Sequence, residues 1–142
     1  MRTGLFAVAA AVAVLTAGAA CAEVLHFTAK LDGASETPPN DSKGAGKAWV
    51  NLDTASKMLD WKVEYSGLSG PATMAHFHGP APVGKAAGVA VPLKGDVASP
   101  AKGSATLTDA QVADLKSGMW YVNVHTAAHP GGEIRGQVMA GK

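Results

Sequence analysis

Apolar and polar residues alternate along several short stretches of the chain, and this two-residue period predicts β-strands. The alternation is clearest in residues 58–65, where Leu59, Trp61 and Val63 share one face and charged residues occupy the other. Strands that are wet on one side are typical of an antiparallel sheet. Further strands are expected at residues 24–31, 47–53, 89–93, 104–107, 119–126 and 133–138, and through the His-x-His segment at residues 76–78.

Residues 108–116 carry the chain's one helix signal. Thr108 is a suitable N-cap with Gln111 three positions later, which is the spacing of a capping box, and Gly118 provides a C-terminal stop. With about seven short strands, this helix and many Gly/Pro turns, the pattern predicts an all-β fold. We expect an antiparallel, immunoglobulin-like or Greek-key β-sandwich with one short helix.

The N-terminus has the features of a secretory signal peptide. Arg2 precedes an apolar run over residues 5–17, and Ala20-Cys21-Ala22 resembles a cleavage site. The run is shorter than the roughly 20 residues that a transmembrane helix needs. We therefore expect a signal peptide at residues 1–22, a single domain at 23–142, and a periplasmic or secreted protein without a membrane span. Lipid attachment at Cys21 is the alternative to cleavage after Ala22.

Composition narrows the partners and the ligands. Without residues 1–22 the chain keeps 11 basic and 11 acidic side chains, so its charge favours neither nucleic acid nor a membrane surface as partner. Cys21 is the only cysteine and leaves with the signal peptide. Any metal site in the mature domain must therefore use imidazole and oxygen ligands.

Four of the five histidines lie in two segments, residues 73–80 and 121–137. His76 and His78 are two positions apart on a predicted strand, so their side chains share a face with Cα atoms roughly 6.6 Å apart. We expect this pair to form a metal site with His125 and His129. An all-imidazole ligand set favours copper, with zinc less favoured.

Several neighbours of the histidines are candidates for supporting roles. Arg135 is a candidate catalytic residue that attracts a small anion, and the alternative is an internal ion pair with Glu133. Tyr121 and Asn123 share the predicted face of His125, and Asn123 can orient a ligating imidazole.

Other polar and aromatic residues have simpler expected roles. We expect Glu36 to be a solvated loop carboxylate and His26 to lie on a wet face of its strand. Trp49 and Trp61 are expected in the core. The chain has neither a G-x-x-x-x-G-K-[ST] phosphate loop nor a G-x-S-x-G nucleophile motif, so nothing supports hydrolase chemistry.

Three separated motifs resemble the CHRD (chordin) domain. They are Leu31-Asp32-Gly33-Ala34-Ser35-Glu36-Thr37-Pro38-Pro39, Ala75-His76-Phe77-His78-Gly79-Pro80-Ala81, and the stretch from Tyr121 to Gln137 that contains His129-Pro130-Gly131-Gly132-Glu133-Ile134-Arg135. The resemblance spans nearly the whole expected domain and implies a secreted β-sandwich, a type that also occurs as a single domain in secreted bacterial proteins. It implies little about activity.

The chain is also similar, more weakly, to copper-containing superoxide dismutases. These have a His-x-His strand, matched here by His76 and His78, a later strand histidine, matched by His125, and an arginine near the C-terminus, matched by Arg135. A disulfide and an aspartate-bearing zinc loop are missing from this sequence, and His129 has no counterpart.

Three functions remain open from the sequence. The first is a mononuclear copper enzyme that disproportionates superoxide, and the second is a copper carrier or store without turnover. The third is a structural or adhesive module without metal, because the fold by itself does not select a function.

Overall fold

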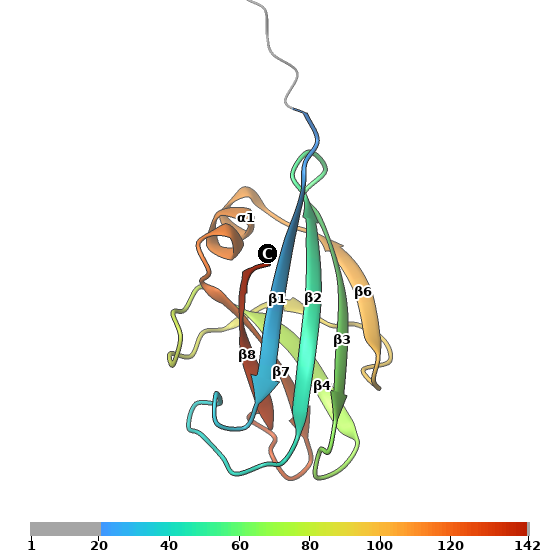
Figure 1. The fold of residues 1–142 in the computed structure, drawn as a ribbon, viewed down its shortest axis with the longest axis vertical. Coiled ribbons are helices and arrows are strands. Elements are labelled where there is room, and N and C mark those ends of the chain that lie inside the picture. The colour runs from blue at the N-terminus through green and yellow to red at the C-terminus, as the bar shows by residue number, and fades with distance from the viewer. Residues whose placement is uncertain (1–20, 142) are drawn as a thin grey trace, which may run out of the picture.

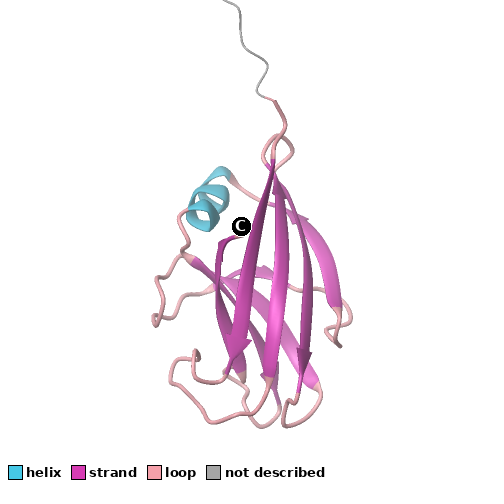
Figure 2. Ribbon diagram, viewed as in Figure 1, coloured by secondary structure: helices cyan, strands magenta, loops and turns pink. Residues whose placement is uncertain are grey.

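A computed structural model describes residues 21–141, and the N-terminal run on which most of the predicted signal peptide falls lies outside them. The regular elements of the described residues are strands joined by loops, with one helix beside an end of the sheet (Figures 1 and 2). The elements are β1 (Val24–Asp32), β2 (Ala45–Asp53), β3 (Met58–Ser66), β4 (Ala72–His78), β5 (Val89–Pro92), β6 (Ala101–Thr106), α1 (Asp109–Lys116), β7 (Trp120–Thr126) and β8 (Ile134–Ala140).

The predicted all-β antiparallel fold is confirmed. Eight strands are hydrogen-bonded in the order β5-β4-β7-β8-β1-β2-β3-β6, and every neighbouring pair is antiparallel. The sheet curls so that β1, β2, β3 and β6 lie in front of β4, β7 and β8 (Figure 1). The two layers of this sandwich therefore belong to one continuous sheet, because β8 pairs with β1.

A single hydrophobic core fills the space between the layers. Phe77 on β4 lies at its centre, with ring centroids 5.5 Å from Trp61 on β3 and 5.9 Å from Trp120 on β7. Each such aromatic pair contributes about 0.5–1.5 kcal/mol beyond the burial of its area. The predicted core face of β1 is also correct, since Phe27 and Leu31 are buried.

One core prediction is wrong, and one strand is longer than expected. Trp49 is half-buried on the outer face of β2, where the ammonium groups of Lys47 and Lys62 lie 5.0 Å and 4.4 Å from its ring centroid. The neighbouring lysine stems cover this indole, so that a large aromatic residue is accommodated outside the core. Strand β6 begins at Ala101 rather than near residue 104 because it pairs with β3 along its whole length.

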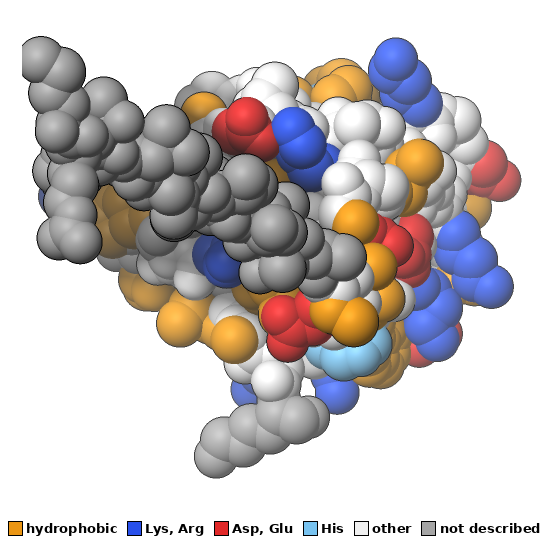
Figure 3. All heavy atoms as spheres, turned by 90° about the horizontal axis from the view of Figure 1, so that it is seen from above, with side chains coloured by type: hydrophobic (Ala, Val, Ile, Leu, Met, Phe, Trp, Pro, Cys, Tyr) orange, Lys and Arg blue, Asp and Glu red, His pale blue; other side chains and the backbone are white. Residues whose placement is uncertain are grey.

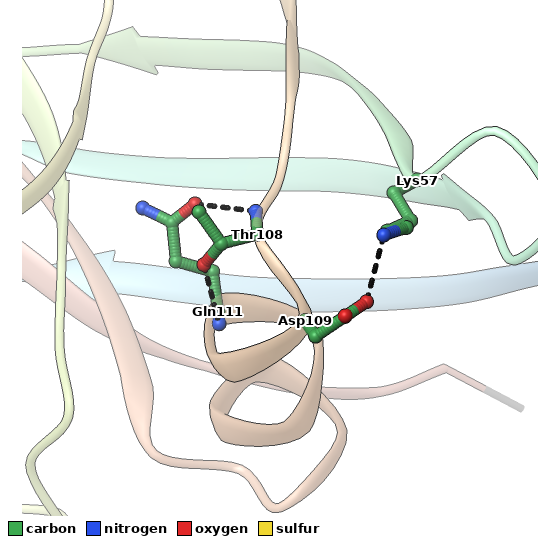
Figure 4. A network of polar contacts seen from close by, with 4 residues as sticks. All are labelled: Lys57, Thr108, Asp109 and Gln111. Atoms are coloured by element: carbon green, nitrogen blue, oxygen red, sulfur yellow. Dashed lines mark hydrogen bonds and ion pairs between the residues drawn. The ribbon is translucent and has the colours of Figure 1, made fainter.

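The helix begins as its sequence predicts. The Thr108 hydroxyl accepts a hydrogen bond from the Gln111 amide at 3.2 Å, and the Gln111 side chain accepts one from the Thr108 amide at 2.9 Å (Figure 4). This capping box satisfies donors that the first turn leaves free. Lys57 and Asp109 form an exposed ion pair at 2.7 Å, which adds little stability.

No helix in residues 21–141 is long and apolar enough to cross a bilayer. On the end of the molecule drawn in Figure 3, basic, acidic and hydrophobic side chains are interspersed without a patch of one charge.

Candidate metal centre

Two adjacent strands place the histidines together. In the β4–β7 register His76 lies opposite Asn123 and His78 lies opposite Tyr121, while His125 lies two residues beyond Asn123 on the same strand. Because side chains two apart share a face, all five project from one side of the sheet. Tyr121, Asn123 and His125 share a face of β7, as predicted, and they therefore lie beside the His-x-His pair of β4.

The structure brings three of the four predicted ligands together. His76, His78 and His125 each offer a ring nitrogen, and these nitrogens lie within 4.8 Å of one another. The closest pair is His76 Nδ1 and His125 Nε2, at 3.1 Å. His78 and His125 are buried, whereas His76 is half-buried and forms the open side of the group. Segments about fifty residues apart therefore converge as the sequence predicts.

His129 lies outside this group. It belongs to the loop between β7 and β8, where its backbone amide and carbonyl hydrogen-bond with Thr126 and Gly132. With Glu36 and Thr37 it lines a separate cavity of about 270 Å³. Its role as a ligand stays a prediction.

Backbone carbonyls fix the protons of the two buried histidines. His78 Nδ1 is 3.1 Å from the carbonyl oxygen of Ala87, and His125 Nδ1 is 2.8 Å from that of Pro130. A carbonyl oxygen only accepts hydrogen bonds, so each Nδ1 carries the proton and each neutral ring directs the Nε2 lone pair inward. This arrangement is the one that orients histidine ligands in metalloproteins.

The side-chain oxygen of Asn123 lies close to the Nε2 atoms of both His78 and His125. Its Nδ2 donates to Glu36 Oε1 at 3.4 Å, which turns Oδ1 toward the imidazoles. Oδ1 lies 2.9 Å from His78 Nε2 and 3.0 Å from His125 Nε2. Three acceptor atoms therefore face one another across hydrogen-bonding distances with no proton between the oxygen and either nitrogen. The three histidines of this group could hold a metal ion.

Protonation of His76 and His78 is disfavoured, because the pKa of each is lowered. Burial lowers the pKa of His76, and the nearby His125 and His78 lower it further. Burial also lowers the pKa of His78, as do the charges of His125 and Arg135, and together they outweigh the hydrogen bonds that raise it. Neutral imidazole is the form of histidine that ligates metal ions, and the lowered pKa values of His76 and His78 favour that form.

Glu36 is a functional candidate that the sequence placed second: it could reach the site, but a solvated loop carboxylate was the favoured interpretation. It was expected in solvent, but only 7% of it is exposed, and its carboxylate is held by Asn123 Nδ2 and by the Thr37 amide. Burial raises its pKa despite these hydrogen bonds and the nearby charges of Arg135 and His125. Its place in the Leu31–Pro39 motif was the available signal, but only the folded loop shows that it faces inward.

Gly132 explains how the β7–β8 loop closes against this carboxylate. A Cβ atom at this position would collide with Glu36 Oε1 and with Asn123 Nδ2, and its φ of 127° lies in the region that favours glycine. Gly132 thus lets the backbone pass directly over Glu36 and Asn123.

The expected ion pair between Glu133 and Arg135 is not formed. Glu133 is fully buried and accepts hydrogen bonds from the hydroxyls of Ser42, Ser69 and Thr126 at 2.6–2.8 Å, and from the Ser69 amide at 2.8 Å. Burial alone would raise its pKa, but these hydrogen bonds outweigh it and lower the pKa to about 2. Glu133 lies just before β8 and is directed at the hydroxyls of Ser42, Ser69 and Thr126, whereas Arg135 donates to Thr37 and to the Lys85 carbonyl.

Arg135 is engaged behind the histidine group. Its guanidinium lies 3.4 Å from the ring centroid of Tyr121, whose ring also stacks on His78 at 4.7 Å and 4°. The guanidinium of Arg135 and the imidazole of His78 are too close to the Tyr121 ring to lie on the same face of it. Tyr121 therefore lies between Arg135 and His78. The guanidinium donates to Thr37 Oγ1 at 2.9 Å and to the Lys85 carbonyl at 2.7 Å.

Comparison with known proteins places the chain in a family. A sequence model of the CHRD domain matches residues 27–138, which is most of the described chain. The chain belongs to the CHRD domain family. It is 36% identical to chordin from Xenopus laevis over 117 residues, an alignment that covers 76% of this chain and 12% of chordin. The domain thus corresponds to a small part of that protein. No solved structure matches the chain.

Proposed function

We propose that this CHRD domain binds one copper ion through His76, His78 and His125, and that it does so as an exported protein. The observation that carries the proposal is the convergence of two Nε2 lone pairs and the Asn123 oxygen, with separations of 2.9 Å and 3.0 Å. The predicted signal peptide at residues 1–22 supports a periplasmic or secreted location.

The types of ligand support copper over zinc. Imidazole nitrogen and amide oxygen are ligands for both ions, and Cu(II) accepts them in tetragonal arrangements. Cu(II) also binds a given set of such ligands more tightly than Zn(II).

Binding without turnover is the function that the geometry supports best. An enzyme acting on superoxide needs a positive group directed at the anion beside the metal. Arg135 is 2% exposed, stacks on Tyr121 and directs its donors to Thr37 and Lys85. Superoxide disproportionation is the second candidate, favoured by the half-buried His76, which leaves the group open on one side.

Titration of the purified protein with Cu(II) tests the site. We expect one ion per chain, nitrogen hyperfine coupling in the electron paramagnetic resonance spectrum, and tighter binding than for Zn(II). Separate His76→Ala, His78→Ala and His125→Ala variants should each lose affinity by at least about tenfold, since even changes outside the ligand shell cost that much.

His26→Ala is the matched control, because His26 is an exposed histidine on a strand and forms a hydrogen bond with Asn51 outside the proposed site. His129→Ala determines whether a fourth histidine takes part. Copper binding that is equally weak in the wild type and in the His76→Ala, His78→Ala and His125→Ala variants would refute the proposal.

An assay of superoxide decay separates carriage from catalysis. We expect the copper-loaded protein to be no faster than the same amount of free copper. A faster rate that falls when Arg135 is replaced by alanine, together with loss of its salt dependence, would favour the enzyme.

A further inference from the structure

Met74 occupies the position on β4 that extends the histidine row. Its residue pairs with His125 in the β4–β7 register, and it precedes His76 by two positions on the same strand. Side chains two apart on a strand share a face, so Met74, His76 and His78 project from the same side as His125. The thioether therefore starts from the same surface as the candidate ligands.

The distance and the flexibility of the side chain allow contact with the same ion. Directly opposed residues on antiparallel strands have Cβ atoms about 4.5–5.5 Å apart, and methionine spans such distances with three rotatable bonds. Met74 is 47% exposed, so it is free to turn toward the half-buried His76 that forms the open side of the group. Its sulfur therefore has access to the side of the site that the buried residues leave open.

We propose that the Met74 thioether is a ligand for Cu(I) at the site of His76 and His125. This rests on the proposed copper function and deepens it by assigning the oxidation state that the site accepts. Cu(I) is soft and is selected by thioether sulfur, whereas imidazole nitrogen and amide oxygen also suit Cu(II) and Zn(II).

A nitrogen–oxygen group on one side and a sulfur on the other give one site two ligand sets. Cu(II) uses the imidazoles and the Asn123 oxygen, and Cu(I) uses Met74 with the imidazoles nearest to it. The domain therefore retains copper in either oxidation state, and the sulfur adds selectivity for Cu(I) over Zn(II), which gains little from a soft neutral ligand.

The test measures affinities for Cu(I), Cu(II) and Zn(II) separately on the intact protein and on Met74→Leu, which keeps the volume and removes the sulfur. Anaerobic competition with a chromophoric Cu(I) chelator should show a loss of about tenfold or more, by comparison with the losses that accompany changes near a metal site. Affinities for Cu(II) and Zn(II) should stay within about twofold. X-ray absorption of the Cu(I) form should show a sulfur neighbour that disappears in the variant.

Met139→Leu is the matched control, because Met139 is similarly exposed at 51% but lies on β8 and pairs with Thr28. It should leave all three affinities unchanged. An unchanged Cu(I) affinity in Met74→Leu, or a sulfur signal that persists, would overturn the assignment of Met74 while leaving the histidine site standing. Failure of the wild type to bind Cu(II) would instead overturn the proposed function.

Discussion

The same chain of contacts, histidine to asparagine to carboxylate, occurs twice in this domain. On the outer face His26 contacts Asn51 Oδ1 at 2.7 Å, and Asn51 donates to Asp60 at 2.9 Å. In the candidate site His78 contacts Asn123 Oδ1 at 2.9 Å, and Asn123 donates to Glu36 at 3.4 Å. We call these the outer ladder (His26, Asn51, Asp60) and the inner ladder (His78, Asn123, Glu36).

The two ladders differ in what surrounds them. The outer ladder is exposed or half-exposed, and water can satisfy any atom that the protein leaves free. All three residues of the inner ladder are less than 9% exposed, and a second histidine, His125, contacts the same asparagine oxygen. Residue types alone therefore do not make the site. Burial and a second convergent imidazole distinguish the inner ladder, whose histidines could hold a metal ion, from an ordinary surface contact.

Among these changes, loss of the Glu133 carboxylate should lower the free energy of unfolding the most. Glu133 joins the segments that carry Ser42, Ser69 and Thr126, so Glu133→Ala leaves three hydroxyls, of which that of Thr126 is buried, without their charged partner. We expect a loss of roughly 3–5 kcal/mol in the free energy of unfolding, measured with urea. Asp60→Ala in the outer ladder should cost less than about 1 kcal/mol. Equal costs for the two changes would contradict the distinction.

Low pH should destabilise the folded domain, because it protonates the Glu133 carboxylate. The pKa of Glu133 is about 2 in the folded protein, below its ordinary value of 4.5, so the folded state favours the charged form. The resulting stability is complete above about pH 4.5 and is lost as the pH falls toward 2, and this difference corresponds to about 3 kcal/mol.

Urea unfolding at several pH values, for the wild type and for Glu133→Gln, isolates this effect from other carboxylates. The gap between the two proteins should narrow as the pH falls from 4.5 to 2. A gap that stays constant over this range would show that the charge of Glu133 does not contribute.

Metal should stabilise the folded domain only through the inner histidines. At a free Cu(II) or Zn(II) concentration one hundred times the dissociation constant, the free energy of unfolding should rise by about 2.7 kcal/mol. The thermal midpoint of His26→Ala should rise as in the wild type, and that of His125→Ala should hardly move. A similar response of His125→Ala would place the bound ion elsewhere.

Comparison of the two asparagines should give the smallest difference in stability. Asn123→Ala removes a buried amide and leaves Glu36 without its partner, so without metal we expect a loss of about 1–2 kcal/mol. Asn51→Ala on the outer face should change the free energy of unfolding by less than about 0.5 kcal/mol. A thermal melt of each variant measures both, and a larger loss in Asn51→Ala would contradict the role given to burial.

Local patterns predicted most of the strands and three of the site residues. The alternation in β3 and the capping box of α1 are set by short-range periodicity and hydrogen bonding, so both were found from the sequence. His76 and His78 share a face because of the strand period. His125 was expected to join them because it lies on another predicted strand. The alternation in β7 was also read correctly, although all seven of its residues are buried.

The errors arose where a side chain's surroundings come from distant segments. Trp49 was placed in the core because it is large and apolar, but Lys47 on its own strand and Lys62 on β3 cover it on the outer face. Glu36 was placed in solvent because its loop is polar, but the β7–β8 loop closes over it at Gly132. Glu133 and Arg135 are near in sequence, yet their partners come from other loops and from β7.

The strands, the capped helix and the face from which each histidine projects follow from the sequence, because they depend on periodicity within a few residues. Three relations follow from the folded arrangement of distant segments: Asn123 directs its oxygen at two ring nitrogens, Arg135 lies behind Tyr121, and Met74 lies opposite His125. Those relations depend on strand register and loop closure, which are set by packing between segments far apart in the chain.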